Sequence, residues 1–193
     1  MKRIGIGGGI GSGKTGIAKA FETFDIPVYY ADNEAKKIME TKHIRNRITR
    51  AFDASLFIDG KLNKTRMSKL IFNDDRSRQQ INDIVHPAVY KDFNRWAKQQ
   101  NKDIVMIEAA ILFETGLHKQ LDATILVLAD EQERIQRIEK RDHRGRASVM
   151  ERIKSQQNPD NFINLATFLI YNNDTDEVLP QILRIHKTLT NNG

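Results

Sequence analysis

The chain has 193 residues, of which 39% are hydrophobic and 29% are charged, and it contains no cysteine. This length suits one compact domain with a small inserted part, and the composition is that of an ordinary globular protein. The lack of cysteine excludes disulfides and thiolate metal sites. No stretch approaches the ~18 apolar residues of a membrane span, and the N-terminal apolar run is too short for a signal peptide. We therefore expect a cytoplasmic protein with no membrane partner.

The net charge is +6, from 31 lysines and arginines against 25 aspartates and glutamates. A basic chain binds either nucleic acid or a smaller anion such as a nucleotide. Much of the arginine lies between Arg134 and Arg152 instead of along a continuous stripe, and only 7% of the residues are aromatic. Few aromatic residues weaken a base-stacking interpretation. The pattern favours small polyanions over nucleic acid as partners.

The first part of the chain has the pattern of a strand, a helix and a second strand. An apolar strand is expected at about 3–7 and an amphipathic helix at about 14–24. Residues 25–27, which end in a proline, break this helix. The second strand is expected at 28–31, so that Asp32 lies at its carboxyl end. Alternation of this kind predicts an α/β fold with a mostly parallel sheet.

The middle of the chain, residues 33–100, is expected to be mostly helical. Residues 59–60, Asp-Gly, indicate a turn, and Asn63 or Thr65 could cap the helix that follows. A further helix is expected to end near 86–87, because a residue before proline avoids the helical region.

The C-terminal part alternates again between apolar runs and helical patterns. Its expected elements are, in order, strands at 104–107 and 124–128, a helix at 131–140, a charged stretch at 141–146 and a strand at 168–171. A final amphipathic helix has Pro180 in its first turn, where proline is tolerated. Its apolar face, with Ile182 and Ile185, fits either the core or an interface between copies of the chain.

Residues 8–15, Gly-Gly-Ile-Gly-Ser-Gly-Lys-Thr, match the pattern G-x-x-x-x-G-K-[ST]. Glycines let backbone N–H groups converge on phosphate oxygens, and a helix that begins near Lys14 directs its positive end at the same anion. Lys14 then reaches the β and γ phosphates, and the Thr15 hydroxyl suits Mg²⁺. The residues expected to bind the nucleotide at this loop are Gly9, Ile10, Gly11, Ser12, Gly13, Lys14 and Thr15.

The context of this loop weighs against a chance run of glycines, because a strand precedes it and an amphipathic helix follows it. The loop alone does not separate a kinase from a switch GTPase or an ATPase. A guanine-reading protein would normally carry Asn-Lys-x-Asp. Residues 63–66 lack the final aspartate and residues 101–104 have it in the wrong place, which favours ATP.

Three carboxylates follow predicted strands. Asp32 lies where an open α/β sheet has its ligand crevice, so it could accept the proton of an attacking hydroxyl, or it could cap the next helix. Glu108 and Glu114 bracket an apolar run, and one of them could hold magnesium through water or position the acceptor. The alternative is an exposed loop carboxylate, which is favoured for Glu114. His86 is either a helix-end residue or a substrate contact, and the scattered histidines predict no metal site.

The arginine-rich segment has two interpretations. Charge runs are usually solvated helix faces. The alternative is a lid whose arginines close over the triphosphate and stabilise charge during phosphoryl transfer. Arg137 and Arg141 are four residues apart and share one helix face, and Gly145 would permit a hinge between Arg144 and Arg146. The lid is favoured because a phosphate loop makes such a clamp useful.

Several short motifs, in their order and spacing, resemble the dephospho-CoA kinase family over nearly the whole chain. They are the loop at 8–15, Tyr30-Ala31-Asp32, Leu70-Ile71-Phe72, Val85-His86-Pro87, Ile111-Leu112-Phe113-Glu114, Arg137 with Arg141, and Arg152-Ile153 with Gln156. Many enzymes share the loop, but its combination with the His-Pro and Leu-Phe-Glu elements is specific. Nucleoside monophosphate kinases share the loop and a lid without that set.

The resemblance implies a three-layer P-loop NTPase fold with a parallel five-stranded sheet, a helical substrate-binding part and a lid. We accordingly expect a single kinase domain with a core at about 1–55, 101–140 and 160–193, a CoA-binding part at about 56–100 and a lid at about 141–159. The implied reaction transfers the γ-phosphate of ATP, with Mg²⁺, to the ribose 3′-hydroxyl of dephospho-CoA, the last step of coenzyme A synthesis. The alternatives are another small-molecule kinase of the nucleoside monophosphate type, a non-catalytic nucleotide switch and a basic nucleic-acid binder.

The resemblance also assigns roles by position. The residues concerned are, for catalysis, Asp32, Lys14 and Arg141; for the nucleotide, Arg137 and Asn172 beside the loop; for the metal, Thr15; and for the acceptor, Asp32, His86 and Glu108. The chain departs from the family pattern at Gly7, Tyr30 and Tyr171. Because Tyr30 replaces a frequent aspartate, a role usually shared by two carboxylates falls on Asp32 alone or on Glu108. We expect a monomer or a weak homo-oligomer, without nucleic acid.

Overall fold

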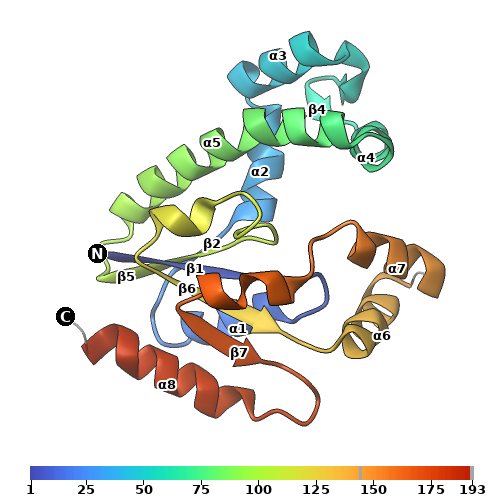
Figure 1. Cartoon of the computed structure of the whole chain (residues 1–193). Coiled ribbons are helices and arrows are strands. Elements are labelled where there is room, and N and C mark those ends of the chain that lie inside the picture. The colour runs from blue at the N-terminus through green and yellow to red at the C-terminus, as the bar shows by residue number, and fades with distance from the viewer. Residues whose placement is uncertain (144, 192–193) are drawn as a thin grey trace. The chain divides into compact units, whose positions relative to one another are not determined.

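The structure of the chain is a computed structural model that describes residues 1–143 and 145–191 (Figure 1). Arg144, one of the arginines expected beside the hinge, lies outside the described residues, as does the side chain of Phe72 from the Leu-Ile-Phe motif.

A five-stranded sheet lies at the centre of the half of the chain formed by residues 1–30 and 100–193, with the strand order β2-β5-β1-β6-β7. The strands are β1 (Lys2–Gly8), β2 (Val28–Tyr30), β5 (Ile104–Glu108), β6 (Ala123–Leu128) and β7 (Phe168–Tyr171). Strand β1 pairs in parallel with β5 and β6, and β6 pairs in parallel with β7. Buried residues run without interruption along β5, as expected of a strand covered on both faces. The predicted α/β fold with a five-stranded parallel sheet is confirmed.

Two glycines of β1 leave room for the segment that follows β5. A Cβ atom added at Gly5 would lie 2.6 Å from Leu121 and 2.8 Å from Leu112. A Cβ atom added at Gly7 would lie 2.9 Å from the ring of Phe113. Such distances are shorter than van der Waals contact, so larger residues there would push this segment away. Gly7, one of the departures from the family pattern, therefore allows Phe113 to pack closely against β1.

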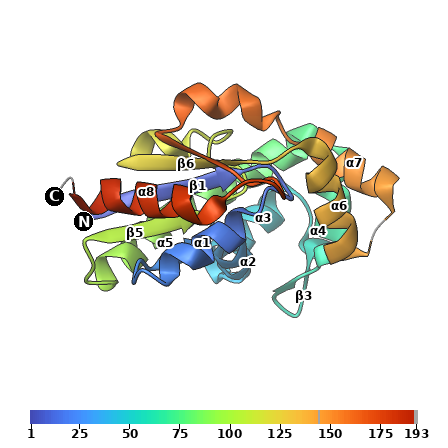
Figure 2. The ribbon, with the colours of Figure 1, turned by 90° about the horizontal axis from the view of Figure 1, so that it is seen from below.

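Helices α1 (Lys14–Glu22) and α8 (Val178–Asn191) lie side by side on one face of the sheet (Figures 1 and 2). Ile182 and Ile185 of α8 are buried, whereas Leu183 is 46% exposed. The apolar face of α8 therefore packs mainly into the core. The remaining elements of this half are α6 (Glu131–Asp142), α7 (Arg146–Lys154) and the short 3-10 helices η2 (Leu117–Gln120) and η3 (Pro159–Leu165).

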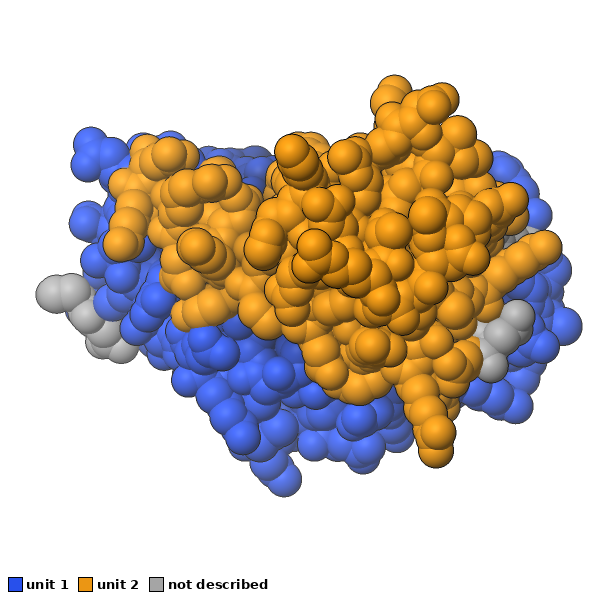
Figure 3. All heavy atoms as spheres, turned by 90° about the horizontal axis from the view of Figure 1, so that it is seen from above, with its two compact units in different colours: residues 1–29, 100–193 blue, residues 30–99 orange. Residues whose placement is uncertain are grey.

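The chain divides into two compact units, residues 1–29 with 100–193 and residues 30–99, which Figure 3 shows in blue and orange. The second unit, residues 30–99, contains the segment at about 56–100 for which the sequence suggests substrate binding, and that role stays a prediction. Its elements are α2 (Ala31–Glu40), α3 (Lys42–Ala51), η1 (Ala54–Leu56), β3 (Phe57–Ile58), β4 (Lys61–Leu62), α4 (Lys64–Asn73) and α5 (Asp75–Gln99).

Local sequence signals explain the middle of this second unit. Asp59 and Gly60 have φ values of 49° and 78°, the left-handed conformations that a two-residue hairpin turn requires. Asn63 caps α4, because its side-chain oxygen accepts a hydrogen bond from the N–H of Arg66 at 3.2 Å. The predicted turn and one of the two predicted caps are therefore present, and the cap is Asn63 and not Thr65.

The helix expected to end near residues 86–87 does not end there. Helix α5 is 25 residues long and continues through Pro87. Proline inside a helix removes a hydrogen bond and costs about 3 kcal/mol. Buried residues on both sides of it, among them Val85 and Val89, pack α5 against α2, α3 and α4. This tertiary packing outweighs the local preference of proline, so the sequence-based boundary was wrong.

Candidate functional site

The loop between β1 and α1 has the backbone of a phosphate cradle. Gly11 and Gly13 have φ values of 82° and 89°, which glycine adopts without strain. Gly13 is the N-cap residue of α1 and has no side chain to cap the helix, so the amides of the first turn stay available to an anion. Among the described residues, the Ser12 hydroxyl is one of two buried side-chain polar atoms that lack a hydrogen-bond partner. Such an orphaned group fits a bound phosphate.

Lys14 begins α1 and lies among acidic side chains. Its Nζ is 3.9 Å from Oε1 of Glu108, and the two side chains are only 12% and 6% exposed. The register of the sheet explains this approach, because Glu108 pairs with Ile6 at the end of β1 from which the loop leaves. Burial raises the pKa of Glu114, and the positive charge of Lys14 partly opposes this rise. Glu114 is therefore half-buried near Lys14, which corrects its interpretation as an exposed loop carboxylate.

Asn172 contacts the other side of the loop, and Arg137 is bonded to Asn172. The amide Nδ2 of Asn172 donates a hydrogen bond of 2.7 Å to the carbonyl oxygen of Ser12. Arg137 donates through Nη1 to the Asn172 carbonyl at 2.7 Å, and through Nη2 to Glu133 and Asp174. The two residues that the resemblance assigned to the nucleotide therefore lie together next to the loop.

Arg141 and Arg137 share helix α6 but have separate partners. Arg141 donates hydrogen bonds to both carboxylate oxygens of Asp142, and Arg152 of α7 donates to the same carboxylate at 2.7 Å. These bonds, first that from Arg141, lower the pKa of Asp142 to about 2. His143, with φ of 50°, ends α6, while Gly145 is the N-cap of α7 with φ of −67°. The residue with the left-handed conformation at the end of α6 is therefore His143 and not Gly145, and the hinge at Gly145 stays a prediction.

Two residues that the sequence analysis had not assigned to the loop also contact it. Arg134 donates a hydrogen bond to the Ile10 carbonyl, and Gln156 accepts one from the Ile10 N–H. Gln156 belongs to a motif of the resemblance, whereas Arg134 had been counted only in the charge run. Its position three residues before Arg137, on nearly the same helix face, was the available signal.

In the second unit, Asp32 and His86 are the candidate residues. Asp32 is the second residue of α2 and is exposed, and the N-cap of this helix is Tyr30. Asp32 is thus not the N-cap, although its negative charge in the first turn stabilises the helix through its dipole. Burial lowers the pKa of His86 below its ordinary value of 6.5, and the carboxylates of Asp83 and Asp32 oppose this effect. Asp32 and His86 are therefore close enough to interact electrostatically.

Within residues 1–143 and 145–191, no helix is long and apolar enough to cross a membrane. In the same ranges, no group of three or more histidines and carboxylates is arranged to hold a metal ion.

Known proteins resemble the chain over almost its whole length. Residues 2–177 match the dephospho-CoA kinase family. A dephospho-CoA kinase of Bacteroides fragilis is 35% identical over 185 residues, 95% of this chain and 90% of the relative. The crystal structure of TT1252 from Thermus thermophilus has a TM-score of 0.84 at 27% identity and covers 97% of this chain and 96% of its own.

A dephospho-CoA kinase of Campylobacter jejuni has the same fold, with a TM-score of 0.70 at 18% identity and coverage of 99% and 98% of the two chains. The matched range includes the phosphate loop and all the other motifs on which the resemblance depends. The chain therefore belongs to the dephospho-CoA kinase family.

Proposed function

We propose that this chain transfers the γ-phosphate of ATP to the ribose 3′-hydroxyl of dephospho-CoA and so forms coenzyme A and ADP. The observation that carries the proposal is the intact phosphate loop, with the buried Lys14 next to Glu108, in a chain of this family. Phosphoryl transfer needs little covalent chemistry from the protein. Positioning and stabilisation of charge supply most of the catalysis.

The loop and its neighbours form the donor half of the proposed site. Backbone amides at Gly11 and Gly13–Thr15 bind the phosphates, while those of Ile10 and Ser12 donate to Gln156 and Gly9. The ammonium group of Lys14 stabilises charge on the β and γ phosphates. Arg137 and Asn172, which are hydrogen-bonded to each other beside the loop, are suited to bind the nucleoside. Magnesium, when bound, neutralises phosphate charge, and the hydroxyl of Thr15 would hold it, with Glu108 acting through water.

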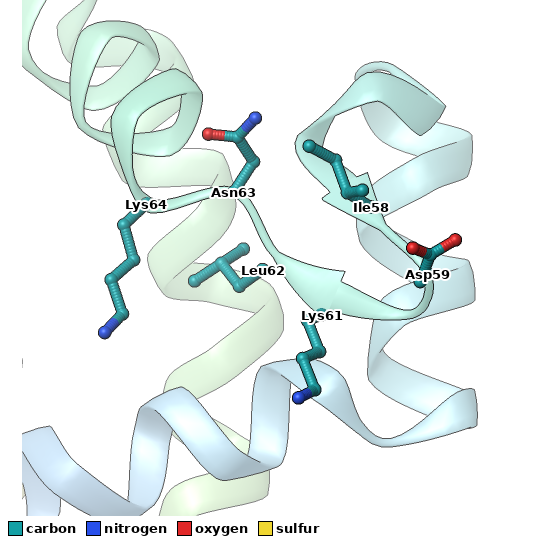
Figure 4. A pocket seen from close by; sticks show the side chains of 6 residues that line it. All are labelled: Ile58, Asp59, Lys61, Leu62, Asn63 and Lys64. Atoms are coloured by element: carbon teal, nitrogen blue, oxygen red, sulfur yellow. The ribbon is translucent and has the colours of Figure 1, made fainter.

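Residues 30–99 form the acceptor half in this proposal. They contain 15 lysines and arginines against nine aspartates and glutamates, so the whole net charge of +6 resides there. Figure 4 shows a pocket at the β3–β4 hairpin from which Lys61 and Lys64 extend their side chains in the same direction. A basic surface of this kind suits the pyrophosphate of dephospho-CoA.

The catalytic assignments rest on chemistry and on position in the family pattern. Asp32 accepts the proton of the ribose hydroxyl or orients that hydroxyl, and His86 and Glu108 contact the acceptor. Arg141 belongs to a lid at about 141–159. When Arg141 releases Asp142 and binds a phosphate instead, its charge would stabilise the phosphoryl group that is transferred. The lid, the CoA-binding part, the cytoplasmic location and a monomeric or weakly oligomeric state stay predictions.

The experiment that tests the proposal is ADP release from ATP and Mg²⁺ with each of several acceptors. Dephospho-CoA should stimulate ADP release, while AMP, other nucleoside monophosphates and shikimate should not. Mass spectrometry should find one added phosphoryl group on the ribose 3′ position. Stimulation by a nucleoside monophosphate would contradict the proposal and identify a kinase of that type. ATP binding without any acceptor-dependent turnover would instead indicate a nucleotide switch.

A further inference from the structure

The apex of the phosphate loop is held by two side chains on opposite sides of one residue. The N–H of Ile10 donates a hydrogen bond of 2.7 Å to Oε1 of Gln156, two residues beyond α7. The carbonyl oxygen of Ile10 accepts one of 2.9 Å from Nε of Arg134, on α6. Both backbone groups of Ile10 therefore have partners that lie more than 100 residues away in the chain. Such bonds fix the orientation of the peptide planes on either side of Ile10.

Arg134 also explains two glycines that the nucleotide motif does not require. Positions 9 and 11 are variable in the pattern G-x-x-x-x-G-K-[ST]. A Cβ atom added at Gly9 would lie 2.7 Å from Nη2 of Arg134, and one at Gly11 would lie 2.7 Å from its carbonyl oxygen. The loop thus packs directly against the side chain and the backbone of Arg134. Larger residues at either position would have to displace it.

A third contact joins the same residue to the helix pair. The side chain of Ile10 packs against the buried cluster between α6 and α7, which consists of Ile135, Ile138, Val149 and Ile153. The loop apex, α6 and α7 are therefore linked by two hydrogen bonds and by an apolar contact. A change in the position of α6 relative to the loop would break the Arg134 bond and the apolar contact.

The charge of Arg134 is unusual for a merely structural contact. Its side chain is 5% exposed, and burial lowers its pKa, an effect that Glu131 and Asp160 oppose. Its bound acceptor is a carbonyl and not a carboxylate. A buried guanidinium is costly unless an anion compensates it. A triphosphate in the adjacent loop would provide such an anion at short range.

We propose that Arg134 is a positioning residue for the phosphate donor. It holds the peptides around Ile10 in the orientation that binds phosphates, and it couples the α6–α7 pair to the loop. The inference rests on the proposed function only in that the loop binds ATP. It adds a specific residue, outside the family motifs of the sequence, that controls the affinity for the nucleotide and not for the acceptor.

The test compares Arg134→Met, which keeps the length but loses the donors and the charge, with Arg134→Lys, which keeps the charge but lacks Nε. Lys140→Met removes an exposed cation from the same helix and serves as the control. Calorimetry gives the Kd of ATP and ADP, kinetics gives the KM of dephospho-CoA, and urea unfolding gives stability. We expect both Arg134 variants to bind ATP about tenfold more weakly or worse, with an unchanged KM for dephospho-CoA and an unaffected control.

A merely structural role would give a different pattern. Folded Arg134→Lys protein with the wild-type Kd for ATP would overturn the proposal, whatever its urea midpoint. If Arg134→Met fails to fold, the lysine variant still decides, because it keeps the charge and most of the packing. A third outcome separates this inference from the proposed function. If the wild-type protein shows no turnover with dephospho-CoA, but both Arg134 variants bind ATP more weakly, the proposed acceptor is contradicted and this inference stands.

Discussion

At the scale of single residues, Lys14 and Glu108 form an ion pair beside the phosphate loop. Both side chains are nearly buried, and their 3.9 Å separation is long for a hydrogen bond. A buried charge pair repays its desolvation only when further hydrogen bonds or a ligand complete it. A ligand that places phosphate oxygens at Lys14 would provide such a partner for the lysine.

The first prediction concerns Lys14. Lys14→Ala should weaken ATP binding about tenfold or more, because a charge-assisted hydrogen bond contributes about 1.5–3 kcal/mol. Isothermal calorimetry with ATP and with AMP measures the effect, which should be small for AMP. Lys19→Ala, an exposed lysine of the same helix, is the matched control. Equal ATP affinities of wild type and Lys14→Ala would show that this residue does not contact the phosphates.

The second prediction concerns Asp32. Asp32→Asn should lower turnover about 10²-fold or more, the usual reach of a general base, with ATP affinity almost unchanged. Glu34→Gln is the matched control, because both acidic residues lie in the first turn of α2, where negative charge stabilises a helix. Steady-state kinetics of the two variants separates the roles. If both variants showed the same small loss of turnover, Asp32 would only stabilise the first turn of α2.

At the scale of elements, α5 shows how packing overrides local preference. Pro87 lacks the N–H that would bond to the carbonyl of Asp83, yet the helix continues for 12 more residues to Gln99. Val85 and Val89 anchor it on either side of the proline. The helix thus retains a local defect next to His86, a residue that we assign to the acceptor site. Defects retained at functional sites often cost stability.

The third prediction measures this defect. Pro87→Ala should restore a helical hydrogen bond and raise the free energy of unfolding by roughly 1–2 kcal/mol, less than the full helix penalty because the unfolded chain also gains freedom. Urea unfolding gives the change. Pro180→Ala is the control, since Pro180 lies in the first turn of α8, where proline costs little. A destabilised Pro87→Ala protein would mean that contacts of the proline ring outweigh the missing bond.

At the scale of the whole molecule, charge is divided unequally between the two units. Residues 1–29 and 100–193 contain 16 basic and 16 acidic residues, whereas residues 30–99 have a net charge of +6. The unit that we assign to ATP is thus neutral, and it binds its anion through local groups at the loop. The unit that we assign to dephospho-CoA is basic as a whole and attracts anions at longer range.

The fourth prediction follows from this division. Raising the ionic strength from about 0.1 M to about 1 M shortens the screening length from about 10 Å to about 3 Å. The KM of dephospho-CoA should rise several-fold more than the KM of ATP, because exposed charges are screened more than the enclosed contacts of the loop. Initial rates at several salt concentrations, with the other substrate saturating, give both constants. A larger effect on ATP would contradict the assignment of the basic unit to the acceptor.

The features predicted correctly depend on residues that are close in sequence. The strand–loop–helix pattern at 8–15, the turn at 59–60 and the cap at Asn63 each depend on a few consecutive residues. The family resemblance, which the comparisons confirm, added the reaction class. The positions of Arg137 and Asn172 beside the loop were anticipated by the same resemblance, while their roles stay predictions.

The sequence by itself therefore determined the sheet, the phosphate loop and the family, because periodicity and motif spacing are local properties. Only the tertiary structure decided that α5 passes through Pro87, that Glu114 is half-buried near Lys14, and that Arg134 and Gln156 hold Ile10. Those outcomes depend on contacts between segments far apart in the chain. Burial and packing there outweigh the local preferences that a sequence pattern records.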